Sequence, residues 1–176
     1  MTGSPPIQPD AVAEATLLHL LGLLRKAQSP REAAWAVTSQ AIAALGLEDC
    51  VVYLSNPDGL TLTQVAVFGP KLKAVGMIEN SITLRFGHGI VGHAAEQKTV
   101  IRVDDTRLDP RYVLDDNHRL SEIAVPVLDE NRVLGVLDSE HSDAGFYTEH
   151  HEQVLRQMAE LLAARLIQIR SLTDRH

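Results

Sequence analysis

Apolar residues recur at helical spacing near both ends of the chain, and short strand-like runs lie between them. Leu17, Leu20, Leu21 and Leu24 follow the i, i+3, i+4, i+7 spacing of one helix face. The spacing returns near the C-terminus in Leu155, Met158, Leu162, Leu166 and Ile169. Helices on both sides of a strand-rich centre favour an α+β fold, in which the terminal helices cover one face of a sheet and the middle of the chain covers the other.

A second helix is predicted to begin after Ser29. Ser29 suits the N-cap, Pro30 suits the first helical position, and Glu32 completes a capping box. Gly46 suits the left-handed conformation that ends many helices. The helix is therefore expected to run to Leu45.

Two hairpins are expected in the centre. The first joins strands at 50–55 and 60–68 through Asn56-Pro57-Asp58-Gly59, where proline presets φ and glycine accepts a positive φ. The second joins strands at 122–128 and 133–138, although proline at position 126 lacks the N–H that a strand donates.

The segments between the hairpins have weaker signals. Residues 69–80 have no clear pattern, and 81–86 form a further strand candidate. The stretch Gly87-His88-Gly89-Ile90-Val91-Gly92 resembles a glycine-rich loop that enters a short helix, before a strand at 99–103. A Gly-x-Gly-x-x-Gly pattern alone is a weak dinucleotide signal, and its flanks do not read as βαβ. We expect these glycines to serve a tight turn and close helix packing.

Charge and hydropathy exclude several classes of partner. The formal net charge is −7, whereas nucleic-acid and anionic-membrane surfaces need clustered Lys and Arg, so neither partner is expected. No apolar stretch is long enough to span a bilayer, and residues 1–10 are proline-rich rather than built like a signal peptide. The expectation is a cytoplasmic protein with a disordered lead, 1–10, and a single domain, 11–176.

Cysteine and histidine usage points away from a metal site. Cys50 is the one cysteine and lies in an apolar run, which favours a small buried side chain over a reactive thiol. No Cys/His spacing resembles a zinc site, so no metal ligand is predicted.

From Gly87 to the last helix, a series of short motifs resembles the GAF domain family in order and spacing. The matching pieces are Gly87–Ala94, Val103–Asp105, Asp109–Tyr112, Ser121–Val127, Arg132–Asp138 and Phe146–Glu149. The resemblance implies a central antiparallel sheet, terminal helices on one face, and a ligand pocket on the other face under a roof formed by about residues 86–118.

The resemblance also implies a role and partners. GAF domains of this type occur in sensor histidine kinases and other regulators, usually as dimers. We therefore expect a homodimer through helices 11–28 and 148–170, and a signalling partner or a downstream kinase or effector domain. The ligand is an unidentified small molecule, and no cofactor is assigned.

Candidate ligand-binding residues come from the implied roof and from the second hairpin. The set is Phe86, His88, Ile90, Val91, Asp105, Tyr112, Glu122, Asp138 and Glu140. Asp138 and Glu140 are two apart, so their side chains share one face of a strand. The hypothesis is that the three carboxylates bind a cationic group. The alternative is that they are solvated at strand ends or capped by backbone donors.

The second hairpin is also similar to that of free methionine-(R)-sulfoxide reductase, an enzyme with the GAF fold. The resemblance implies redox cysteines in the middle of the chain, where this sequence has Val91 and, near the later position, Leu114–Asp115. Without those thiols the reductase reaction lacks its nucleophile. The expectation is therefore a non-catalytic sensory or regulatory domain of bacterial signal transduction, including two-component systems. The alternatives are an interaction scaffold with a vestigial pocket and a reductase-like enzyme.

Overall fold

A curled antiparallel sheet forms the centre of the computed structural model, which describes residues 9–70, 72–74, 77–78, 80–114 and 117–174. Its strands are β1 (Cys50–Ser55), β2 (Thr61–Phe68), β5 (Thr83–Arg85), β6 (Ile101–Val103), β7 (Ser121–Asp129) and β8 (Arg132–His141). They form one six-stranded sheet in the order β5-β2-β1-β8-β7-β6, and every pairing is antiparallel.

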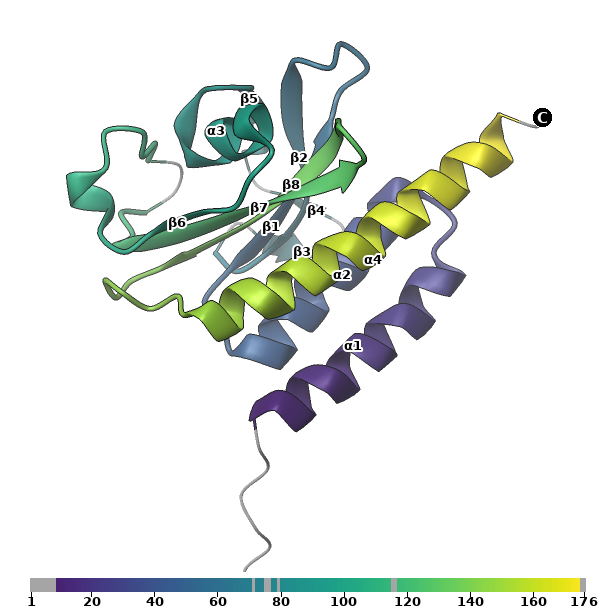
Figure 1. The fold of residues 1–176 in the computed structure, drawn as a ribbon, viewed down its shortest axis with the longest axis horizontal. Helices are drawn as coiled ribbons and strands as arrows, with labels where there is room; N and C mark the ends of the chain where they lie inside the picture. The colour runs from purple at the N-terminus through teal and green to yellow at the C-terminus, as the bar shows by residue number, and fades with distance from the viewer. Residues whose placement is uncertain (1–8, 71, 75–76, 79, 115–116, 175–176) are drawn as a thin grey trace, which may run out of the picture.

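Helices cover both faces of this sheet, as Figure 1 shows. The helices are α1 (Pro9–Lys26), α2 (Pro30–Leu45), α3 (Gly89–Gln97) and α4 (Glu149–Thr173). α1, α2 and α4 lie together on one face, and α3 lies on the other. The predicted α+β class with the terminal helices on one face is confirmed.

The period-two alternation of the strands divides the core into two layers. On β1, Val52 packs into the layer under α2 and α4, whereas Val51 and Tyr53 pack into the layer under α3. β7 alternates in the same way: Ile123 faces the helical layer and Ala124 faces α3. Because both faces are covered, these strands are apolar on both sides rather than on alternate residues only.

The local signals around α2 are confirmed. The Ser29 side chain accepts a hydrogen bond from the backbone N–H of Glu32 at 3.2 Å, and Pro30 is the first residue of the helix. The Glu32 carboxylate accepts from the N–H of Gln28 at 2.7 Å, one residue before the cap. Gly46 ends the helix with φ 62° and donates to the carbonyl of Ile42 at 2.8 Å.

Both hairpins are confirmed as well. Between β1 and β2 the turn is closed by a hydrogen bond from the Gly59 N–H to the Asn56 carbonyl at 3.0 Å. Pro126 is tolerated in β7 because β6 pairs only with residues 122–124, so β7 has one partner strand, β8, at the proline.

Three expectations need adjustment. The 69–80 segment contains a small two-stranded sheet of β3 (Leu72–Ala74) and β4 (Met77–Ile78). Of the predicted disordered lead, 1–8 lies outside the described residues, while Pro9 and Asp10 already belong to α1. The roof also contains a short 3-10 helix, η1 (Thr106–Leu108).

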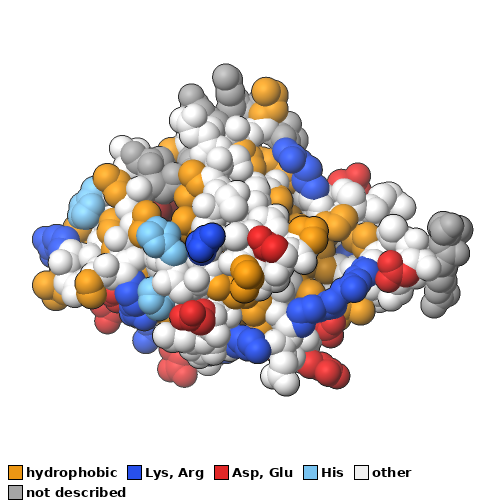
Figure 2. Space-filling view, turned by 90° about the horizontal axis from the view of Figure 1, so that it is seen from above, with side chains coloured by type: hydrophobic (Ala, Val, Ile, Leu, Met, Phe, Trp, Pro, Cys, Tyr) orange, Lys and Arg blue, Asp and Glu red, His pale blue; other side chains and the backbone are white. Residues whose placement is uncertain are grey.

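The surface gives two further observations. Figure 2 shows basic, acidic and hydrophobic side chains intermixed on the face that it presents. Among the described residues, the helices that reach the length of a membrane span all lack the required apolar stretch.

Candidate functional site

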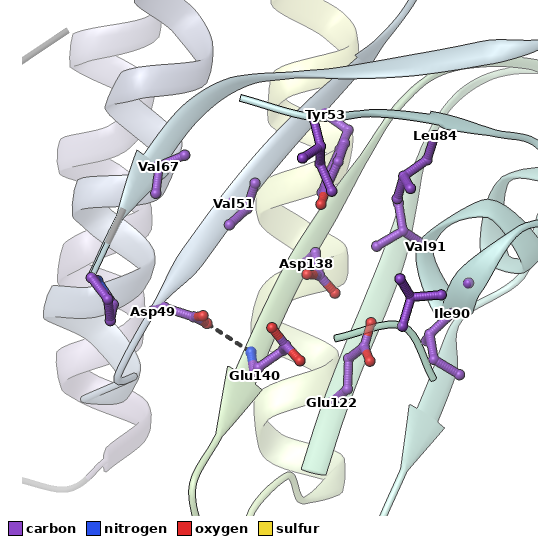
Figure 3. Close-up of a pocket in the computed structure, with 14 residues that line it drawn as sticks. Asp49, Val51, Tyr53, Val67, Leu84, Ile90, Val91, Glu122, Asp138 and Glu140 are labelled. Carbon is purple, nitrogen blue, oxygen red and sulfur yellow. Dashed lines mark hydrogen bonds between the residues drawn. The ribbon is translucent and has the colours of Figure 1, made fainter. Parts of the chain in front are cut away.

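A small pocket lies between the face of the sheet that α3 covers and the N-terminal end of α3 (Figure 3). Its cavity volume is about 30 Å³. The lining combines an apolar part with an acidic part. The lining residues are Asp49, Val51, Tyr53, Val67, Pro70, Ile82, Leu84, Gly89, Ile90, Val91, Val113, Glu122, Asp138 and Glu140.

The three carboxylates singled out in the sequence meet in this pocket. Glu122 lies on β7 opposite Glu140 on β8, and Asp138 lies two residues before Glu140 on the same face. Figure 3 shows the three side chains pointing into the same space. Their exposed fractions are 5% for Glu122, 6% for Asp138 and 7% for Glu140, so the alternative that they are solvated at strand ends does not hold.

A fourth carboxylate, Asp49, lines the same pocket and was not among the predicted residues. It immediately precedes β1, and its Oδ1 accepts the backbone N–H of Glu140 at 2.7 Å, the dashed line in Figure 3. The signal was available in the sequence: positions 49, 51 and 53 alternate, so Asp49 shares the face of Val51 and Tyr53.

Burial and mutual repulsion keep two of these groups from ionising normally. Burial, followed by the charge of Glu140, raises the pKa of Glu122 well above its usual value. Burial, followed by the charge of Glu122, raises the pKa of Asp138 well above its usual value. The Glu122 and Asp138 side chains are within hydrogen-bonding contact of each other. Oδ1 of Asp138 is buried and receives no hydrogen bond from a donor of the described residues.

Tyr112, in the segment that follows η1, does not belong to the pocket lining but interacts with Glu140, which does. The Tyr112 hydroxyl accepts the backbone N–H of Arg119 at 3.1 Å and also contacts the side chain of Glu140. Burial is the main reason that the pKa of Tyr112 is raised. Arg111 is near enough to Glu122 to interact with its charge, but it already forms an ion pair with Asp109 at 2.6 Å.

The remaining predicted residues divide into two groups. Ile90 and Val91 line the pocket as expected. Phe86, His88 and Asp105 do not belong to the lining.

Each of the three excluded residues has another local role. Phe86 packs at the edge of the apolar layer under α3. His88 is the exposed residue that precedes α3. Asp105 caps η1 and pairs with Arg107 at 2.7 Å.

The glycines around α3 have the structural role that the sequence predicted. A methyl group at Gly92 would collide with the carbonyl oxygen of Arg85, and Gly87 has φ 78°. All strand pairs described are antiparallel, so the βαβ unit of a dinucleotide site is absent from the described part of the chain. Val113 packs close to Gly89, and both residues line the pocket.

The thiol chemistry considered for the reductase is not found in the pocket lining. Cys50 is fully buried in the helical layer on the other face of the sheet, and burial raises its pKa well above the usual value. Of the two positions that the resemblance implies for cysteines, Val91 lines the pocket and Leu114 is exposed. Asp115 lies outside the described residues.

No group of three or more His, Cys, Asp or Glu side chains in the described ranges is arranged to hold a metal ion.

Comparison with known proteins identifies the family of the chain and finds relatives that are named as an enzyme. The model of the GAF domain family matches residues 29–166. The chain is 31% identical over 93 residues to the "Free methionine-R-sulfoxide reductase" of Escherichia coli (strain K12), which covers 53% of this chain and 54% of that protein. It is 31% identical over 87 residues to "Protein YtsP" of Bacillus subtilis (strain 168), covering 49% and 53%. The chain thus spans about half the length of the curated relatives it matches.

Solved structures show the same fold. The free methionine-R-sulfoxide reductase from Neisseria meningitidis, in complex with its substrate, superposes with a TM-score of 0.82 at 20% identity and covers 98% of both chains. The GAF domain of an Acinetobacter phosphoenolpyruvate-protein phosphotransferase gives a TM-score of 0.78 at 18% identity, covering 90% of this chain and 94% of that one.

These comparisons correct the predicted function. A non-catalytic sensory domain was expected because the chain lacks the implied cysteines. That prediction is wrong, because the relatives at 31% and 30% identity include proteins named for an enzymatic reaction. The cysteine count considered only the thiols of this chain and gave no information on the acidic pocket.

Proposed function

Because the chain belongs to the GAF domain family, we propose that its carboxylate pocket binds a free amino acid, with free methionine-R-sulfoxide as the first candidate. The identity of the ligand is suggested by the names of the relatives. The class of ligand is supported by the pocket itself, which places four buried carboxylates beside an apolar compartment.

The observation that carries this proposal is Oδ1 of Asp138. It is buried in the pocket and receives no hydrogen bond from a donor of the described residues. A buried carboxylate without donors is costly unless a cation or a proton satisfies it. The α-ammonium group of an amino acid carries three N–H donors and one positive charge, which suits Asp138 together with Glu122 and Glu140.

The N-terminal end of α3 suits the other charge of an amino acid. Gly89, Ile90 and Val91 line the pocket and are the first residues of the helix, so their N–H groups have no acceptor within it. Such a helix end favours an anion, because its N–H groups and its dipole both point toward the ligand. A zwitterion can therefore place its ammonium group on the carboxylates and its own carboxylate on α3.

The apolar part of the lining suits a methionine-like side chain. Val51, Val67 and Leu84 belong to the same pocket lining as the carboxylates (Figure 3). A cavity of about 30 Å³ holds only water-sized groups. Binding therefore requires the roof to move, and Val113, which packs against Gly89, is the nearest exposed part of it.

Binding is tested by isothermal titration calorimetry with L-methionine-R-sulfoxide and with its N-acetyl derivative, which lacks the ammonium charge. We expect the free amino acid to bind and the acetylated form not to bind. D138N should weaken binding by about thirtyfold or more, since loss of one partner of a buried charge pair costs ~2 kcal/mol or more. Equal binding of the two compounds contradicts the proposal.

The matched control is D129N, an acid-to-amide change at the last residue of β7. Asp129 pairs with Arg132 at 2.7 Å near the surface and does not line the pocket. D129N should bind like the wild type. A similar loss of binding in D129N and D138N would show that the effect is not local to the carboxylates.

Reduction of the bound sulfoxide is the second candidate, favoured by the names of the two reductase relatives. The reaction consumes two thiols and releases the sulfide, a disulfide and water, so it needs two electrons from a thiol reductant. Cys50 is buried on the opposite face of the sheet, so we assign the thiols to an added dithiol. Chromatographic detection of methionine after incubation with dithiothreitol tests this. Methionine formation no faster than in D138N contradicts it.

A further inference from the structure

The contact between Glu122 and Asp138 cannot be made by two ionised carboxylates. An ionised carboxylate only accepts hydrogen bonds, whereas these two buried side chains point into one pocket (Figure 3) and are within hydrogen-bonding contact. One proton between them satisfies the contact and removes one of two adjacent negative charges. Two carboxyl groups that interact this strongly titrate as a pair rather than singly.

The charges of the surrounding groups favour the state in which Glu122 and Asp138 hold one proton between them. On β8 and before β1, Glu140 and Asp49 add negative charge to both groups. The lining residues that α3 contributes, Gly89, Ile90 and Val91, carry no charge.

Among the described residues, the groups near η1 and those on the other face of β8 add no free positive charge that would favour the ionised pair. Asp109 adds negative charge near Glu122, and its partner Arg111 is already engaged with it at 2.6 Å. Tyr112 reaches Glu140, and Tyr147 and Cys50 interact with Asp138; these three groups carry no positive charge in either protonation state.

We propose that Glu122 and Asp138 share one proton in the empty pocket and that a cationic ligand displaces it, so that ligand binding releases a proton. The ligand half of this inference rests on the proposed function. Asp138, whose Oδ1 receives no donor from the described residues, then gains a donor in either state: the shared proton when the pocket is empty, and the ammonium group when it is filled.

The direction of the pH dependence follows from this exchange. Because burial and neighbouring negative charge raise the pKa of both carboxyl groups, the empty pocket holds the proton to a higher pH than a solvated carboxyl group would. The ligand binds the form without that proton, so its apparent affinity rises with pH. If one proton is released, the apparent affinity rises by at most about tenfold per pH unit. The rise ends at the pKa of the carboxyl pair or of the ligand amine.

The ligand-free protein tests the shared proton directly. Infrared spectra at pH 7 should contain the carbonyl stretch of a protonated carboxyl group, and E122Q should lose it. In E122Q the amide at position 122 donates to Asp138, so the contact persists without a proton. D129N should retain the band. A wild-type spectrum without the band, or an unchanged band in E122Q, overturns the proposal.

The release is tested by calorimetry with L-methionine-R-sulfoxide in phosphate and in Tris, buffers whose protonation enthalpies differ. Wild-type protein should show buffer-dependent heat that corresponds to about one proton released, and the affinity should increase between pH 6 and pH 8. Binding whose heat is the same in both buffers overturns the proposal. An infrared band without any binding contradicts the proposed function, yet it supports the shared proton.

Discussion

Asp138 is a residue that lowers the stability of the folded protein and lines the candidate site. Its neighbours on the same face of β8 include Val136, which packs into the apolar layer under α3, and an apolar side chain at position 138 would extend that layer. The carboxylate instead lies against Glu122, and its Oδ1 has no donor in the part of the chain that the structure describes. Buried groups of this kind cost stability, and they occur mainly where a ligand or a reaction uses them.

At the residue scale we predict that D138N stabilises the ligand-free protein at pH 8. A raised carboxyl pKa means that the folded state holds its proton more tightly than the unfolded state. Its stabilising effect is therefore complete below the unfolded pKa and is lost as the pH rises through the folded pKa. The amide needs no proton, so the gain at pH 8 should be ~1–3 kcal/mol in the free energy of unfolding.

Urea denaturation at pH 4 and pH 8 measures this difference. The advantage of D138N should shrink toward pH 4, where the wild-type carboxyl groups are protonated. D129N, at the surface, should change stability by less than about 0.5 kcal/mol at either pH. A destabilised D138N at pH 8 would show that the carboxylate is satisfied in the folded protein.

At the scale of elements, short local signals set where the helices begin and end. α2 begins at Pro30 because Ser29 caps it, and it ends at Leu45 because Gly46 adopts φ 62°. These contacts involve residues no more than four positions apart, so they are encoded in a short stretch of sequence. α3 is different: Gly92 is needed for the approach of Arg85, a contact set by how the loop folds over the sheet.

The prediction for α2 is that S29A lowers the free energy of unfolding by ~1 kcal/mol. Alanine cannot accept the N–H of Glu32, which then lacks its partner at the helix end. Thermal or urea denaturation measures the change. S29D restores an acceptor and also suits the helix dipole, so it should recover most of the loss. If S29D is as unstable as S29A, the effect does not come from capping.

On the scale of the whole molecule, the outer surface of the helical layer remains open. Leu18 and Leu21 of α1 are 67% and 42% exposed, and Ile167 of α4 is also exposed. Beside them, a groove of about 430 Å³ lies between α1 and α4. Leu21, Leu24 and Leu161 are among its lining residues. Exposed apolar surface next to a groove suits a self-complementary contact between two copies of the chain.

We therefore predict a homodimer through α1 and α4, measured by sedimentation equilibrium. L18E should raise the dimer dissociation constant by at least about tenfold, because it places a charge in an apolar contact. L108E is the control: Leu108, in η1, is 82% exposed and does not line the groove, so its change should leave the dimer intact. A monomeric wild type, or equal effects of both variants, contradicts this interface.

The candidate site was predictable in part. The alternation of β8 places Asp138 and Glu140 on one face, and pairing with β7 brings Glu122 opposite Glu140. Asp49 obeys the same alternation, but it lies far from the second hairpin in the chain. Only the pairing of β1 with β8 brings it to the others.

The sequence by itself determined the α+β class, the capped second helix, both hairpins and the shared face of the β8 carboxylates. Each depends on periodicity or on contacts within a few residues. Tertiary structure decided that Phe86, His88 and Asp105 lie outside the pocket while Asp49 lines it. It also decided that the acids are buried against one another. Such facts depend on which distant segments pack together, because burial is a property of the surroundings and not of a residue's own stretch of chain.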